Sequence, residues 1–254
     1  ARLAQLALGD VGPVRGRAAV FDGYGALLPP AALSPVAGEV SRVIDSVFPS
    51  GSRELDDELA RVTAMIASAE PRLLAKFLAS AGPRSHPVTD LHLLITAARI
   101  PLARTSVQRA QTARILVGLQ AKIDRGGLNQ DSNWDDRVGE LYVALCENDP
   151  RLPRAVLETP GFGLPSHVLF LGRMSRQDRA RAREAFVVAI RKAGEDYPWT
   201  GEVVRLLGES MDPKSVDLLR SVHDRADVRG AVVVELARRA TAVDRQRFVN
   251  GLES

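Results

Sequence analysis

The chain has 254 residues, of which 45% are hydrophobic and 26% are charged, and its formal net charge is +3. This composition is typical of a globular protein and excludes a disordered chain or a bundle of membrane spans. A single cysteine excludes a disulfide framework, a CxxCH haem attachment and a cysteine-ligated zinc site.

Helical periodicity extends over almost the whole chain, whereas the alternating pattern of a strand is absent. Leu55, Leu59 and Val62, for example, recur at helical spacing and form one apolar stripe with charge opposite. Prolines tend to stand at the starts of such segments, where a fixed φ and a missing N–H cost little. In chain order, the sequence predicts helices at 2–8, 13–27, 34–47, 52–68, 71–81, 88–99, 106–124, 134–147, 151–158, 165–173, 176–193, 199–209, 214–223, 228–240 and 243–251.

The most regular stretch is 202–240, which predicts two amphipathic helices joined by a short polar turn, with a third helix leading in. Acid–proline pairs begin short apolar helices here and in the segments 70–78 and 149–157. Helix pairs of this kind cannot bury their apolar faces alone, so they indicate a stacked array of neighbours.

Residues 207–240 resemble a HEAT repeat, through Asp212-Pro213, Asp227-Val228-Arg229 and Leu236-Ala237, and residues 14–27 resemble the second helix of another. The resemblance implies an all-α fold, an α-α superhelix in the form of an irregular HEAT-like solenoid that serves as a scaffold. We expect residues 1–254 to form a single helical-repeat domain. The chain is also expected to be a fragment of a longer protein. Departures from a regular array are expected at the Pro/Gly-rich connections 82–90, 100–106, 125–134 and 158–166.

A second resemblance covers residues 54–150, where ELDDELARVTAMI, DLHLLITAAR and NWDDRVGELYVAL are similar to the helical segment of planctomycete-type multidomain proteins. Those proteins join such a segment to a sugar-dehydrogenase-like propeller and a cytochrome c module. The resemblance implies an extracytoplasmic, periplasmic spacer or docking domain, with the haem and the dehydrogenase chemistry outside this chain. Without it, a cytoplasmic location is expected.

The richest polar segment is 125–137. Asp131, Asn133 and Asp135 have the spacing that opens a calcium loop, but Tyr142 stands where a bidentate Glu must close the site. We therefore interpret the segment as a loop that leads into a helix and presents polar and aromatic groups to a partner. The candidate interaction residues in it are Asn129, Asp131, Asn133, Trp134 and Arg137.

A basic stripe follows in the helix predicted at 176–193, where Arg176, Arg179 and Arg183 recur at i, i+3 and i+7. Such an arginine stripe is a candidate contact for phosphates or acidic partners. Its alternative interpretation is the solvated face of an amphipathic helix.

No pattern in the sequence predicts a catalytic, cofactor-binding or metal-binding residue. The four histidines do not pair at i, i+3 or i, i+4, and we interpret His92 as a packed histidine. Cys146 is interpreted as a small buried apolar residue. A nucleophile elbow, a P-loop and a G-x-G-x-x-G cradle are absent from the sequence.

The sequence thus predicts a non-catalytic scaffold or protein-interaction domain within a larger, redox-type multidomain protein. Its expected partners are proteins or neighbouring domains of the same polypeptide, without nucleic acid, cofactor or membrane span. The alternative is a nucleic-acid-binding protein similar to HEAT-like alkylpurine DNA glycosylases, with Trp134, Trp199, Asp135 and the arginine stripe as candidate contacts. A continuous arginine-rich concave face would favour this alternative.

Overall fold

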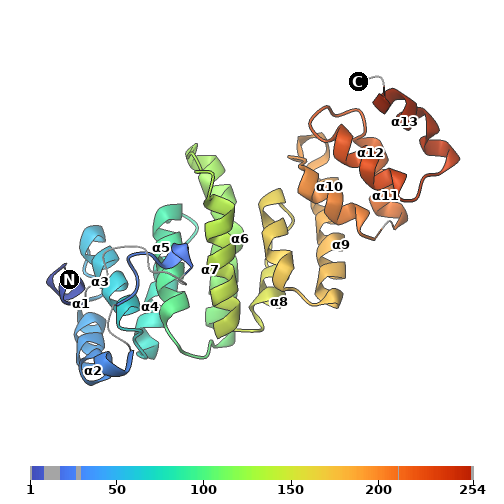
Figure 1. The fold of residues 1–254 in the computed structure, drawn as a ribbon. Coiled ribbons are helices and arrows are strands. Elements are labelled where there is room, and N and C mark those ends of the chain that lie inside the picture. The colour runs from blue at the N-terminus through green and yellow to red at the C-terminus, as the bar shows by residue number, and fades with distance from the viewer. Residues whose placement is uncertain (1, 9–17, 27–29, 211, 253–254) are drawn as a thin grey trace. The chain divides into compact units, whose positions relative to one another are not determined.

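The computed structural model describes residues 2–8, 18–26, 30–210 and 212–252 (Figure 1). These residues form 13 α-helices and four short 3-10 helices, and no strand occurs among them. None of the described helices is both long enough and apolar enough to cross a membrane. The chain folds into two compact units, Ala1–Thr159 (unit 1) and Pro160–Ser254 (unit 2). The single domain expected over 1–254 stays a prediction.

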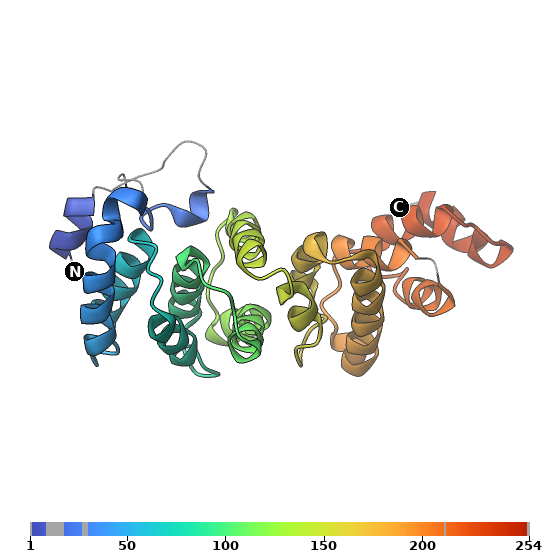
Figure 2. The same ribbon diagram turned by 90° about the horizontal axis from the view of Figure 1, so that it is seen from below.

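Unit 1 consists of two rows of helices (Figures 1 and 2). The odd row contains α1 (Arg2–Leu8), α3 (Arg53–Met65), α5 (Pro87–Arg99) and α7 (Trp134–Asn148). The even row contains α2 (Pro30–Val47), α4 (Pro71–Ser80), α6 (Ser106–Gly126) and α8 (Leu152–Leu157). Each helix packs on the next helix of its own row, and α5 also packs on α4 and α6. Helices that neighbour in space in unit 1 are therefore close in sequence.

Local sequence signals explain where these helices begin and end. Thr105 and Gln108 form a capping box at the start of α6. Proline occupies the first position of α4 and of α5, where no N–H is needed. Gly127, in the left-handed region at φ 58°, ends α6. These signals are local, which is why the boundaries are readable from sequence.

A buried ion pair joins Lys122 of α6 to Asp90 in the first turn of α5, and the same ammonium reaches the connection between α4 and α5. The Lys122 ammonium contacts the carboxylate of Asp90, which is 0% exposed. It also donates to the Gly82 carbonyl at 2.6 Å and contacts the Ser85 hydroxyl at 3.0 Å. All the groups around this ammonium are acceptors, so the charge is buried with partners. Cys146 on α7 is also buried, in agreement with its prediction as a small apolar residue.

Unit 2 contains α9 (Arg176–Ala193), α10 (Gly201–Gly208), α11 (Pro213–Ser221), α12 (Arg229–Ala237) and α13 (Arg245–Leu252). Its 3-10 helices are η2 (Pro165–Arg173), η3 (Gly194–Asp196) and η4 (Ala242–Asp244). The central helix α10 packs on η2, α11 and α12. The helices predicted within 202–240 are thus all present.

An aromatic cluster forms the core of unit 2 around the turn at 160–164. Gly161 and Gly163 adopt φ values of 90° and 121°, and the turn places Phe162 edge-on to Phe186 of α9. The backbone N–H groups of Gly163 and Leu164 donate to Nδ1 of His167. The other members of the cluster are Phe170, Tyr197 and Trp199, all buried.

The predicted helices agree with the observed ones to within a few residues, with two exceptions. Segment 165–173 is a 3-10 helix. The helix predicted at 13–27 is wrong over residues 18–26, which form the 3-10 helix η1 (Ala19–Phe21) and then a β-turn. Gly23 adopts φ 82°, and this left-handed conformation ends a helix. Residues 18–26 therefore contain no α-helix that could correspond to the HEAT second helix that 14–27 resembles. Residues 13–17 and 27 lie outside the described residues.

Candidate functional site

The site with the richest chemistry in unit 1 is a face of the odd row that carries residues 18–26 of the same chain. We call these nine residues the N-terminal turn, and the side of α3, α5 and α7 beneath it the odd-row face. The helix η1 packs on α7, and in Figure 2 the blue segment that contains η1 lies next to the yellow-green helix α7. The odd-row face is therefore covered by the N-terminal turn of its own chain.

The N-terminal turn is compact and holds its own shape. The Phe21 N–H donates to the Ala18 carbonyl, and the Tyr24 N–H donates to the Phe21 carbonyl, both at 3.0 Å. Asp22 has φ −61° and ψ 126°, and Gly23 has φ 82°. These angles define a type II turn over residues 21–24, with glycine at the position that requires a positive φ. The turn brings two aromatic side chains, Phe21 and Tyr24, to its two ends.

Side chains of the odd-row face bind backbone groups of the turn. Glu140 of α7 accepts a hydrogen bond from the Val20 N–H at 2.9 Å. Arg61 of α3 donates to the Gly23 carbonyl at 3.4 Å. Arg137, a predicted interaction residue, lies 3.4 Å from the Glu140 carboxylate and orients it. Because they recognise backbone atoms, these contacts do not depend on the sequence of the bound segment.

The aromatic side chains of the turn add contacts that do depend on sequence. Phe21 and Tyr24 are 8% and 9% exposed. The Arg61 guanidinium lies 4.9 Å from the centre of the Tyr24 ring, and the Arg99 guanidinium lies 5.9 Å from that of Phe21. Both distances are those of cation–π contacts. Tyr24 also makes a hydrogen bond of 2.5 Å with Nδ1 of His92.

The hydrogen bonds of His92 fix its tautomer. Its Nε2 lies 2.8 Å from the Asp57 carbonyl, which only accepts, so Nε2 carries the proton. Nδ1 then accepts the hydrogen bond of the Tyr24 hydroxyl. Burial lowers the pKa of His92, and burial also raises the pKa of Tyr24 to about 12, against an opposing effect of Arg61. The pair is neutral near pH 7, and it serves as a hydrogen-bonded anchor for the turn.

The lowered pKa of His92 predicts an acid-sensitive contribution to stability. The unfolded chain takes up a proton on this residue near pH 6.5, whereas the folded chain resists protonation. The free energy of unfolding of the wild type, relative to His92→Gln, is therefore expected to be constant above about pH 6.5. It should fall below that pH by up to about 1.4 kcal/mol per pH unit. Urea titrations between about pH 8 and pH 5 measure the difference, and a difference independent of pH would contradict the assignment.

The 125–137 candidates lie together at the start of α7. Asn129, Asp131 and Asn133 are exposed, and Trp134, the first residue of α7, is partly exposed. Arg137 is the member of this set that joins the odd-row face, through Glu140. The arrangement is a loop that leads into a helix, in keeping with the interpretation from sequence.

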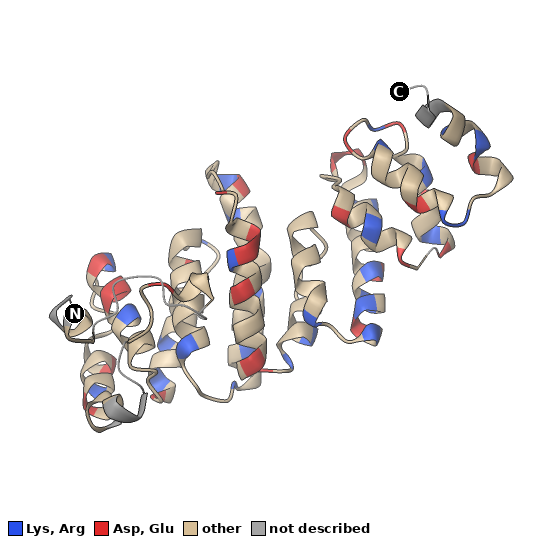
Figure 3. Ribbon diagram, in the orientation of Figure 1, with Lys and Arg blue, Asp and Glu red and all other residues tan. Residues whose placement is uncertain are grey.

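The arginine stripe lies on α9 in unit 2. Arg179 donates to one carboxylate oxygen of Glu209 at 2.8 Å, and Arg183 donates to the other at 3.3 Å. Arg176 is exposed. Two of the three positive charges are thus paired with an acid at the end of α10. Figure 3 shows acidic and basic positions interspersed along the ribbons of both units. Trp199, a candidate for the glycosylase-like alternative, is 7% exposed and packs edge-on against Tyr197.

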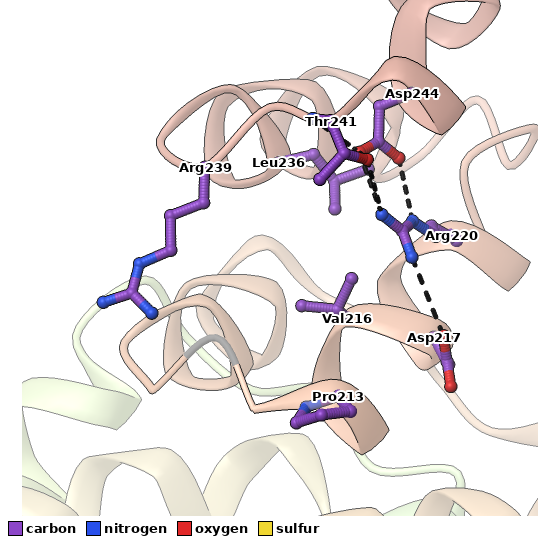
Figure 4. Close-up of a pocket in the computed structure, with 8 residues that line it drawn as sticks. All are labelled: Pro213, Val216, Asp217, Arg220, Leu236, Arg239, Thr241 and Asp244. Atoms are coloured by element: carbon purple, nitrogen blue, oxygen red, sulfur yellow. Dashed lines mark hydrogen bonds and ion pairs between the residues drawn. The ribbon is translucent and has the colours of Figure 1, made fainter.

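Unit 2 also contains a pocket of about 300 Å³ between α11, α12 and η4 (Figure 4). Arg220, one of two arginines that line the pocket, donates to both carboxylate oxygens of Asp244 at 2.8 and 2.9 Å. These hydrogen bonds hold the pKa of the Asp244 carboxyl well below its usual range. Arg220 thus attaches η4 to α11, and its guanidinium is paired with the Asp244 carboxylate. Among the described residues, no group of three or more His, Cys, Asp or Glu side chains is placed to hold a metal ion.

Comparison with models of protein families, with curated proteins and with solved structures found no match to this chain. Sequence reasoning missed the role of Arg61, Glu140 and His92, because they come from three separate helices. One signal for the turn was present, since Asp22-Gly23 is a common turn dipeptide and argues against a continuous helix at 13–27.

Proposed function

We propose that this chain is a non-catalytic protein-interaction domain of HEAT-like helix pairs, within a longer polypeptide, and that its odd-row face binds polypeptide. The observation that carries the proposal is the N-terminal turn, which the face holds by two side chain-to-backbone contacts and two aromatic anchors. Stacked helix pairs commonly present such extended faces to partners. Contacts of this kind suit a segment of another protein or of a neighbouring domain.

The distribution of charge supports a polypeptide over a nucleic acid as the partner. Residues 1–159 contain equal numbers of acidic and basic residues, so the formal charge of +3 falls on residues 160–254. A nucleic-acid groove needs clustered, unpaired cations that neutralise phosphates. On α9 the arginines Arg179 and Arg183 share the carboxylate of Glu209. The glycosylase-like alternative is therefore the less supported of the two.

The proposal is tested by selecting peptides from a random library displayed on phage. The bait is the variant Phe21→Ser/Tyr24→Ser, called the opened variant, because it removes both aromatic anchors of the turn. We expect peptides to be enriched on this bait and to bind it in solution with micromolar dissociation constants, measured by fluorescence anisotropy. Binding should also be measured with Trp134→Ala added, which decides whether the 125–137 loop takes part.

Circular dichroism must show that the opened variant keeps the helix content of the wild type. If a helical bait enriches no peptide above a blank surface, the proposed function is wrong. Duplex DNA is the comparison ligand. Its binding, with a steep dependence on salt, would favour the nucleic-acid alternative.

A further inference from the structure

We infer that the odd-row face selects a β-turn with an aromatic residue at its first position and a tyrosine at its fourth, and that the N-terminal turn is an internal competitor for that partner. This inference rests on the proposed function and specifies the partner: an exposed aromatic-x-Gly-Tyr turn of another polypeptide. Three features of the described residues support it.

The first feature is that the recognising groups are oriented by their own helices. His92 is fixed by the Asp57 carbonyl and Glu140 by Arg137. Arg61 lies 3.9 Å from the carboxylate of Glu58, one helical turn before it on α3. The face therefore keeps its donors and acceptors in place when the turn is absent, and a preformed face loses less entropy when it binds a ligand.

The second feature is that the turn is a self-contained ligand. The hydrogen bonds that shape it lie between residues 18 and 24. The contacts that dock it on the face also come from this short piece, through Val20, Phe21, Gly23 and Tyr24. A nine-residue peptide thus carries the four residues that make these contacts with the face.

The third feature is the close approach at the third turn position. A Cβ built on Gly23 would lie 3.0 Å from Nη1 of Arg61, and the φ of 82° disfavours any side chain there. The backbone conformation therefore selects glycine at this position, and a Cβ there would also displace the Arg61 guanidinium that contacts the turn. This requirement separates the inferred partner from other aromatic peptides.

The internal turn is attached to the same chain, so it competes at a high effective concentration, on the order of millimolar for short linkers. A partner turn of micromolar affinity therefore binds weakly to the wild type and well to a chain whose own turn is released. The N-terminal turn is in this sense an intramolecular inhibitor of the face.

The test uses a fluorescein-labelled peptide with the sequence of residues 18–26, AAVFDGYGA, titrated with the full chain and followed by anisotropy. We expect the opened variant to bind this peptide at least about tenfold more tightly than the wild type does. Peptides with Phe→Ala, Gly→Ala or Tyr→Ala at the positions of residues 21, 23 and 24 should each bind about tenfold more weakly than the parent. A scrambled peptide should not bind.

A second variant keeps the test decisive if the opened variant does not fold. Gly23→Ala strains the internal turn without removing an aromatic group, and we expect peptide affinity to rise by about tenfold. The matched control is Gly51→Ala, which also places alanine at a positive φ of 84° but has no heavy atom within 4 Å of the new Cβ. The control should bind the peptide as weakly as the wild type.

Three results would overturn the inference. The first is a folded opened variant, and a folded Gly23→Ala chain, that bind the peptide no better than the wild type. The second is equal binding of the scrambled peptide. The third is a wild-type dimer, seen by light scattering and abolished by Tyr24→Ser, because the turn would then serve a second copy of this chain. If library peptides bind the face but lack the aromatic pair, the proposed function stands and this inference fails.

Discussion

Replacement of Lys122 by methionine is expected to lower the free energy of unfolding of unit 1 by about 3–5 kcal/mol. The substitution leaves the Asp90 carboxylate, which is 0% exposed, without its cation. It also removes the donor that reaches the Gly82 carbonyl and the Ser85 hydroxyl. A buried charge that has lost its partner keeps the full cost of desolvation, so the effect should be large.

Urea unfolding measures this loss, with fluorescence of Trp134, the one tryptophan of unit 1, in a Trp199→Phe background. The matched control is Lys76→Met, whose partner Asp45 lies 2.9 Å away and whose side chain is 35% exposed. The control variant should lower the free energy of unfolding by about 1 kcal/mol or less. The double variant Lys122→Met/Asp90→Asn should recover part of the loss, because it removes both charges. A loss for Lys122→Met as small as that of the control would show that the pair is solvated.

Replacement of Gly163 by alanine is expected to lower the free energy of unfolding of unit 2 by about 2–4 kcal/mol. Two costs combine at this position. The φ of 121° is strained for any residue with a Cβ, and the new Cβ would lie 2.7 Å from that of Ala189 and 3.2 Å from the Ala185 carbonyl. The turn would have to move away from α9, which would disturb the contact of Phe162 with Phe186.

Gly161→Ala separates the two costs. Gly161 has a φ of 90° but has no heavy atom within 4 Å of an added Cβ, so the variant bears the backbone strain alone. We expect Gly161→Ala to lower the free energy of unfolding of unit 2 by about 1–2 kcal/mol. Trp199 fluorescence in a Trp134→Phe background reports unit 2 in both cases. Equal losses for the two variants would mean that the packing of Gly163 on α9 contributes nothing.

The helices could be predicted from the sequence because their signals are local. The site could not be predicted, because its residues are distant from one another in the sequence. The cap at Thr105 and the Pro71 start each depend on a few adjacent residues. Arg61, His92 and Glu140 come from three helices, and nothing in the sequence around any one of them indicates the other two. Local pattern also failed at 18–26, where apolar residues such as Val20 and Phe21 are compatible with a helix, and the φ of Gly23 decides against it.

The interpretation of the arginine stripe depends on a distant residue in the same way. The spacing of Arg179 and Arg183 places them on one face of a helix, but their common partner, Glu209, lies at the end of α10. The amphipathic pattern of α9 shows only that these arginines lie on the polar side. Tertiary pairing decides whether such charges are available to a ligand, and periodicity within one helix carries no information about it.

Because Cys146 is buried, the rate of its chemical modification can report how often the surrounding helices open. It is the only thiol in the sequence, and on α7 it is 8% exposed, in the same helix that supplies Glu140 to the odd-row face. A thiol reagent reacts with such a group only when the surrounding helices open, so the labelling rate reports the frequency of opening. Two motions can therefore be measured separately. Peptide binding reports the release of the N-terminal turn, and the rate of Cys146 modification reports the opening of the helices around α7.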